Sequence, residues 1–257
     1  MPRLITGLTP QREQALQERL MLRLARSAEK PIQREIARAS RAIANDVDDA
    51  METHRLRMQD ILSRLYMTAF DTFGRRIVNA SRKSLDGMEF KKDTFAPTPR
   101  FDLARKLWIQ STAATKVTQI TGTTELQATE IIRQATADAI EQGLDEKATA
   151  KLIRSRIGEQ GGQLSRLRSR VISRTESHSA SNASNQIAAN QSGLDMRREW
   201  IASGGERTRE DHRNANGQKV GMNEPFTVGG ELLMQPGDPS GSAEQVINCR
   251  CIVGYSI

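Results

Sequence analysis

The first third of the chain carries apolar residues at helical spacing. Leu16, Leu20 and Leu24 repeat every four residues after Thr9-Pro10, which predicts a capped helix from Gln11 to Leu24. Pro31 is expected to break or kink it. A second apolar stripe runs from Ile32 to about Ser81 and predicts one longer helix. Such a stripe needs a partner surface, so a packed helical region is expected.

Lys83 to Arg100 interrupts this pattern with Gly87, Pro97 and Pro99, and the composition predicts a linker or loop. Apolar periodicity then returns. It predicts helices over Phe101–Ile120, Thr124–Gln142 and Asp145–Ile157, with Asp145 as the N-cap of the last, and a further helix from about Gln163 to Gln191 after an interruption by glycines 158, 161 and 162.

Beyond Gly193 the pattern shortens to strands and tight turns. Arg198–Ala202 predicts a strand, and Phe226–Val228 with Glu231–Met234 predicts a hairpin across Gly229-Gly230. Ser242 to Gln245 has capping-box spacing, and a last strand is predicted from Cys249 to Tyr255. The expected fold class is therefore α+β, with a long N-terminal α-helical region followed by a small C-terminal α+β domain of short antiparallel strands. The expected divisions are 1–100, 101–162 and 163–257.

Composition narrows the class of protein. Hydrophobic residues make up 37% of the 257 positions and aromatic residues 4%, which is lean for one large core but sufficient for long amphipathic helices. No apolar run is long enough to span a bilayer, and Met1 to Gly7 lacks a signal-peptide core. We therefore expect a soluble chain made in a cytosol, with no membrane partner. Cys249 and Cys251 are badly placed to bridge each other, so reduced thiols are expected.

Positive charge is concentrated before residue 200. Lys and Arg outnumber Asp and Glu by 33 to 24 in residues 1–200, whereas the remainder has 5 against 7. The densest part of this charge, residues 147–174, could neutralise nucleic-acid phosphates. A solvated helix face or a surface that meets an acidic protein partner explains it equally well. No aromatic residues interleave the charges, so base stacking is not indicated. The densest cations are Lys147, Lys151, Arg154, Arg156, Arg166, Arg168, Arg170 and Arg174.

Five short motifs occur in a fixed order in the last third of the chain. They are Arg174-Thr175-Glu176, Trp200, the segment Arg207 to His212, Asn216-Gly217-Gln218 and the closing Asn248-Cys249-Arg250-Cys251. Each motif is weak alone, but the ordered set resembles the C-terminal domain of phage head morphogenesis proteins, the minor head family typified by phage Mu. The resemblance covers roughly residues 165 to 255.

This resemblance implies a minor head (capsid) protein of a tailed phage, associated with the portal vertex and active in head morphogenesis and in DNA packaging or delivery. It implies the portal protein as partner, with the major capsid and scaffolding proteins as further candidates. It places the chain in the virion head, assembled in the host cytoplasm, and implies no enzymatic activity and no cofactor. The alternative is a non-specific DNA-binding protein acting through residues 147–174; a zinc- or thiol-dependent enzyme is third.

The residue types also allow a metal site. His178, His212, Cys249 and Cys251 offer two imidazoles and two thiolates, which suits tetrahedral zinc. However, a Cys-x-Cys pair on an extended strand directs its two sulfurs to one face about 7 Å apart, unlike the usual zinc knuckle. Relatives often carry His-Pro before the last motif, and here Pro236–Pro239 and the insertion Ser240–Ile247 stand in that place. We therefore predict no metal.

A catalytic site is a second option, because Cys249, His212 and Asn248 are the residue types of a thiol-dependent enzyme. No helix N-terminus is predicted at Cys249 to lower the pKa of its thiol, and a cysteine within a terminal strand is expected to be buried and inert. Arg174 and Glu176 resemble the Arg/Glu pair of ADP-ribosyltransferases, but no strand is predicted there. We therefore predict no catalytic residue.

The third option is architectural, and the sequence favours it. Arg174 or Arg207 would donate a bidentate fork to Glu176, to Asp211 or to a loop carbonyl, and so tie helix, loop and closing strand together. The residues predicted to hold the motif domain in this way are Arg174, Glu176, Arg207, Thr208, Asp211, His212, Asn248, Cys249, Arg250 and Cys251.

Overall fold

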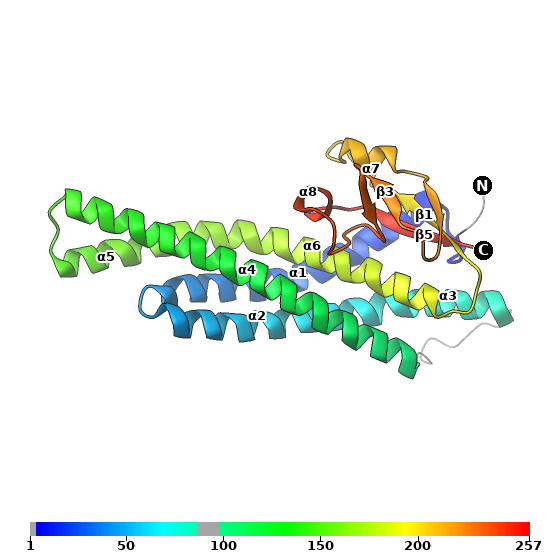
Figure 1. The fold of residues 1–257 in the computed structure, drawn as a ribbon, viewed down its shortest axis with the longest axis horizontal. Helices are drawn as coiled ribbons and strands as arrows, with labels where there is room; N and C mark the ends of the chain where they lie inside the picture. Colours follow the sequence, from blue (N-terminus) through cyan, green and yellow to red (C-terminus); the bar gives the residue numbers. More distant parts are fainter. Residues whose placement is uncertain (1–3, 87–97) are drawn as a thin grey trace. The chain divides into compact units, whose positions relative to one another are not determined.

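The computed structural model describes residues 4–86 and 98–257. Figure 1 shows the fold of the chain. The described chain divides into two compact units. One, here the motif unit, comprises Met1–Ala25, Leu65–Gln110 and Arg174–Ile257; the other, the helical unit, comprises Arg26–Arg64 and Ser111–Ser173. The long helices α1, α2, α4 and α6 contribute residues to both. The divisions expected at residues 100 and 162 remain a prediction.

The first helices differ from the sequence prediction in where they end. Helix α1 spans Pro10–Ile43 and continues through Pro31, so the expected break at that proline is wrong. A turn follows in which Asp46 Oδ1 accepts a hydrogen bond from the Asp49 backbone N–H at 3.0 Å, and α2 begins at Val47 and runs to Ala69. The single helix predicted over residues 32–81 is thus divided, because the short polar residues at 45 and 46 stabilise a turn within an otherwise continuous apolar stripe.

A π-helical turn, η1 (Phe70–Gly74), joins α2 to α3 (Arg75–Asp86). Gly74 is buried, and a Cβ at this position would lie 2.6 Å from the Phe101 ring and 2.8 Å from Ser184 Oγ. Ser184 Oγ also donates a hydrogen bond of 3.2 Å to the Phe70 carbonyl. Because Gly74 has no side chain, its backbone can lie close to Phe101 and Ser184. The π-helical turn leaves the Phe70 carbonyl available to accept the hydrogen bond from Ser184.

The later helices are longer than expected. Helix α4 spans Pro99–Glu141 without a break, where two helices were predicted. Helix α5 (Glu146–Arg156) begins as predicted, because Asp145 accepts a hydrogen bond from the Ala148 backbone N–H at 2.7 Å. The glycines after it form a second π-helical turn, η2 (Ile157–Gly161), which leads directly into α6 (Gly162–Asn190). Residues 87–97 of the predicted linker lie outside the described residues.

The strands confirm the predicted α+β class. In the motif unit, β1 (Arg197–Ile201) pairs antiparallel with β2 (Lys219–Gly221) and with β5 (Ile252–Ser256), giving the order β2-β1-β5. The predicted hairpin is present as β3 (Phe226–Val228) and β4 (Glu231–Leu233), joined by two glycines with φ of 58° and 82°. The sequence prediction missed β2 and the short helix α7 (Glu210–Asn214).

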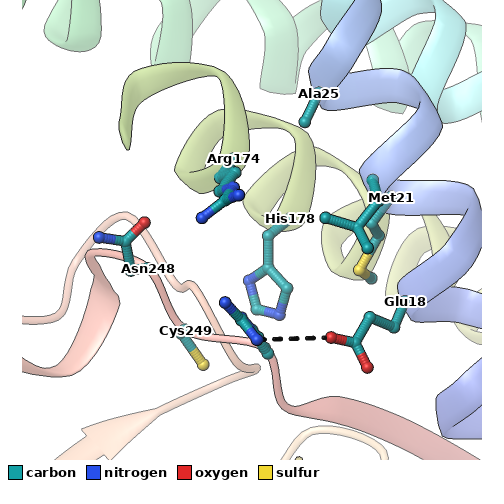
Figure 2. A pocket seen from close by; sticks show the side chains of 9 residues that line it. Glu18, Met21, Ala25, Arg174, His178, Asn248 and Cys249 are labelled. Atoms are coloured by element: carbon teal, nitrogen blue, oxygen red, sulfur yellow. Dashed lines mark ion pairs between the residues drawn. The ribbon is translucent and has the colours of Figure 1, made fainter. Parts of the chain in front are cut away.

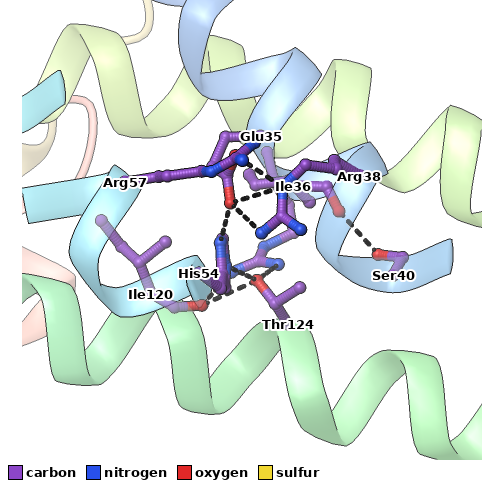
Figure 3. A network of polar contacts seen from close by, with 9 residues as sticks. Glu35, Ile36, Arg38, Ser40, His54, Arg57, Ile120 and Thr124 are labelled. Atoms are coloured by element: carbon purple, nitrogen blue, oxygen red, sulfur yellow. Dashed lines mark hydrogen bonds and ion pairs between the residues drawn. The ribbon is translucent and has the colours of Figure 1, made fainter. Parts of the chain in front are cut away.

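The helical unit buries a polar network within its apolar packing (Figure 3). Glu35 Oε1 lies 3.0 Å from His54 Nδ1, and His54 Nε2 lies 3.3 Å from Thr124 Oγ1. Burial raises the pKa of Glu35, but hydrogen bonds from His54 and Arg38 outweigh it and leave that pKa below its ordinary value. The network therefore fixes the contact between α1, α2 and α4 in this unit.

None of the helices within the described residues is both long and apolar enough to cross a bilayer.

Candidate functional site

The closing Asn-Cys-Arg-Cys motif lies before the last strand. Short helix α8 (Ala243–Val246) ends just upstream, and the Cys249 backbone N–H donates to the Val246 carbonyl at 3.2 Å. Asn248 has a φ of 57°, a left-handed conformation that asparagine tolerates better than most residues. Strand β5 starts only at Ile252, so the strand predicted from Cys249 begins three residues too early. The two cysteines thus lie in the irregular segment between the turn at residues 247–248 and β5.

Because this segment is not an extended strand, both sulfurs reach the same imidazole. His212, from α7, places Nδ1 3.3 Å from Cys251 Sγ and 3.5 Å from Cys249 Sγ. The three ligand atoms all lie within 4.8 Å of one another, and the residues are 1%, 1% and 5% exposed. The expected sulfur separation of about 7 Å, which assumed an extended strand, is therefore wrong.

A second layer of hydrogen bonds orients His212. Its Nε2 lies 2.9 Å from Gln245 Oε1, and Gln245 Nε2 donates to Asp211 Oδ2 at 3.0 Å. Since the amide oxygen accepts only, Nε2 carries the proton and Nδ1 presents its lone pair to the sulfurs. Gln245 binds here and Ser242 makes no side-chain cap on α8, so the predicted capping box does not form. Gly229 packs against this bond: a Cβ there would lie 2.4 Å from Gln245 Nε2.

The two thiols have opposite electrostatic environments. A hydrogen bond from the Cys249 thiol lowers the pKa of Cys251 against the opposing effect of burial, and contacts with His212 and the Ser203 backbone lower it further. Burial raises the pKa of Cys249, and the neighbouring Cys251 sulfur adds to the increase. Deprotonation is therefore easier at Cys251 than at Cys249.

A cleft of about 620 Å³ opens beside the sulfurs, lined by all three cluster residues and by the segment from Ser203 to Arg209. Thr208 is buried, and its hydroxyl donates to the Ser203 carbonyl. Arg174 and Arg207 also line the cleft, but both side chains are exposed. The fork from either arginine stays a prediction, and an exposed guanidinium would contribute little to stability.

Glu176 binds a tyrosine of α2 that the sequence analysis did not include. It is buried and accepts a hydrogen bond from Tyr66 Oη at 2.6 Å. Burial raises the pKa of Tyr66 well above its ordinary value, and the Glu176 charge raises it further. The neighbouring Thr175 accepts the Asn248 backbone N–H at 3.2 Å. The Arg-Thr-Glu motif therefore joins α6 to α2 on one side and to the closing motif on the other.

His178 is not part of the sulfur cluster. Its Nε2 lies 2.6 Å from the Cys251 carbonyl oxygen, and burial lowers the pKa of the ring. It lines a small cavity of about 30 Å³, together with α1 residues such as Met21 and Ala25. Figure 2 shows these side chains. At the edge, Glu18 pairs with Arg250 at 3.8 Å. Among the described residues, the convergent metal-ligand types are His212, Cys249 and Cys251 alone.

Comparison with known proteins shows which family the C-terminal half of the chain resembles. Residues 130–254 match the family described as phage Mu protein F like protein. The chain carries a Mu F-like domain of the phage head morphogenesis family. It is 34% identical to the uncharacterised protein YqbB of Bacillus subtilis strain 168 over 95 residues, which cover 35% of this chain and 31% of that protein.

Two further relatives carry functional names. The minor head protein GP7 of Bacillus phage SPP1 is 32% identical over 136 residues, covering 52% of this chain and 43% of GP7. The NAD(+)–arginine ADP-ribosyltransferase EFV of Enterococcus faecalis V583 is 30% identical over 83 residues, 31% of this chain and 17% of that enzyme. The chain thus spans less than half the length of each of these relatives. No solved structure matches it.

Sequence reasoning missed the buried arginine of the Mu F-like domain, Arg198 on β1. It is fully buried and donates to Gln186 Oε1 at 3.1 Å and to the carbonyls of Gly221, Glu224 and Met234. Its guanidinium also lies 5.1 Å from the centre of the Phe226 ring. Strand alternation could have found it, because Arg198 shares the inward face with Trp200 two positions later.

Several of the cations in residues 147–174 make contacts within the protein. Arg168 donates to Thr124 Oγ1 at 2.9 Å and to the Ile120 carbonyl at 3.0 Å, and burial lowers its pKa to about 10. Arg156 pairs with Asp138, and Arg170 with Glu29 at 3.5 Å. The candidate DNA contacts that remain exposed in the helical unit, apart from Arg170, are Lys147, Lys151, Arg154 and Arg166.

Proposed function

We propose that this chain is a structural minor head protein of a tailed phage, located in the virion head and bound to the portal vertex during head morphogenesis. The observation that carries the proposal is the 136-residue match to minor head protein GP7, together with the Mu F-like match over residues 130–254. The ordered motifs fall within that domain, so the resemblance and the comparisons concern the same residues.

The placement of the motif residues supports a structural role. Glu176, Thr208 and His212 are buried and hold backbone segments or side chains of the same unit together. Cys249 and Cys251 are also buried, which limits attack on a large substrate. Side chains used in this way stabilise one loop arrangement, and an assembly protein needs a fixed surface to bind its partner.

Exposed apolar side chains offer contact surface for such a partner. In the motif unit, Leu103 and Leu107 lie one turn apart on α4 and are 59% and 58% exposed. In the helical unit, Leu126 and Ile140 are 73% and 76% exposed. Burial of such residues against another protein stabilises a complex and does not depend strongly on salt.

Capture by portal protein tests the proposal. The full chain is mixed with the portal protein of the same phage and the complex is isolated at low and at high salt. We expect stoichiometric capture that persists at high salt, and equal capture of the Lys147→Glu/Lys151→Glu variant. Loss of the complex at both salt concentrations would contradict portal association.

Non-specific DNA binding is the second candidate, and the exposed cations Lys147, Lys151, Arg154 and Arg166 favour it. The same preparations are passed over duplex DNA of unrelated sequences. Retention that falls steeply with salt, and that the Lys147→Glu/Lys151→Glu variant loses, would support this function in place of portal binding.

A further inference from the structure

We propose that His212, Cys249 and Cys251 bind one zinc ion through the imidazole Nδ1 and both sulfurs, with Gln245 and Asp211 orienting the imidazole. This inference is independent of the head function, because it concerns what holds the motif unit together. It reverses the sequence expectation of no metal, which depended on two sulfurs separated along an extended strand.

The two nitrogen–sulfur distances match those of a metal centre. With Zn–S bonds of about 2.3 Å and a Zn–N bond of about 2.0 Å, tetrahedral geometry separates the nitrogen from each sulfur by about 3.5 Å and the sulfurs by about 3.8 Å. The structure places Nδ1 at 3.3 and 3.5 Å from the two sulfurs, and all three atoms within 4.8 Å of one another. The donors therefore surround a point where one zinc ion fits.

The outer hydrogen bonds are those that a metal-binding histidine needs. The Nε2 proton is held by Gln245 Oε1 at 2.9 Å, and Gln245 is itself held by Asp211 at 3.0 Å. This fixes the tautomer with an unprotonated Nδ1 and fixes the plane of the ring. The edge contact with Trp200, with ring centres 5.6 Å apart at 89°, restricts the ring further.

Charge balance favours the bound state. One zinc ion with two thiolates and a neutral imidazole is neutral overall, which suits a cluster that is at most 5% exposed. Binding forms two Zn–S bonds and one Zn–N bond, and each thiol that still carries its proton releases it to solvent. The three ligands also line the cleft of about 620 Å³, so a water molecule from that side can complete the tetrahedron.

Metal analysis of the intact chain is the direct test. The full-length protein is purified under reducing conditions without chelators, and zinc per chain is measured by mass spectrometry. The metal-free chain is then titrated with Co²⁺. We expect one zinc per chain and, with Co²⁺, the visible bands of a tetrahedral ion together with near-ultraviolet thiolate charge transfer. A reduced, folded chain that binds neither ion would overturn the proposal.

Variants separate binding from folding. Cys251→Ser and His212→Ala should each abolish stoichiometric binding, whereas His178→Gln, a buried histidine outside the cluster, should retain it. Because the first two can also lose the fold, Gln245→Ala is included; it should weaken zinc affinity by about 10- to 100-fold with an unchanged circular dichroism spectrum. Unaltered affinity in folded Cys251→Ser, or a Cys249–Cys251 disulfide in the freshly isolated metal-free chain, would contradict the site.

Discussion

Replacing Arg198 with methionine is expected to lower the free energy of unfolding by about 3–5 kcal/mol, because removing a buried charged donor leaves its partners unpaired. The guanidinium donates hydrogen bonds to the carbonyls of Gly221, Glu224 and Met234. Gly221 ends β2, Glu224 lies between β2 and β3, and Met234 follows β4. Methionine keeps the side-chain volume, so the loss measures the hydrogen bonds. Urea denaturation followed by circular dichroism gives the value.

The neighbouring Arg197 supplies a matched control for that measurement. It lies on the same strand but is exposed, so Arg197→Met should change the free energy of unfolding by less than about 0.5 kcal/mol. Equal effects of the two substitutions would show that Arg198 does not organise the loops of the motif unit.

Trp200→Ala is the second large effect, at about 3–5 kcal/mol of lost stability, since a fully buried indole leaves a cavity when removed. The ring makes edge contacts with Phe226 at 5.4 Å and with His212 at 5.6 Å between ring centres. Its loss should therefore destabilise the sheet and also release the imidazole from its fixed plane. Thermal unfolding of the metal-free chain measures the first consequence.

Trp200→Phe is the control for this change. Within the described residues the indole Nε1 is buried and has no hydrogen-bond partner, so phenylalanine removes an unpaired donor while keeping most of the aromatic contact. Its cost should be well below that of alanine. A phenylalanine variant as unstable as the alanine variant would contradict the packing account of this position.

Sequence periodicity predicted the type of most elements but not where the helices end. Short-range sequence signals were sufficient to predict the Asp145 cap, β1 and the β3–β4 hairpin. By contrast, Pro31 and Gly122 lie within continuous helices, because packing along α1 and α4 outweighs the local preference of one residue. The turn before Val47 was missed because the apolar stripe continues on both sides of it.

The candidate site shows the same division. Its residue types, His212, Cys249 and Cys251, were evident in the sequence, but their convergence depends on the left-handed Asn248, which no spacing rule reveals. The orienting Gln245 comes from a segment that sequence analysis treated as an insertion. Arg174 and Arg207 were chosen by motif, whereas the buried arginine within residues 130–254 is Arg198, marked only by its inward register on β1.

The most direct test of the proposed head function is the content of the particles themselves. Procapsids and virions of the phage that encodes this chain are purified, and the chain is quantified against the portal protein with isotope-labelled peptides. The account predicts a fixed, low ratio of this chain to portal in procapsids. Absence from procapsids and virions, in cells where both proteins are made, would contradict it.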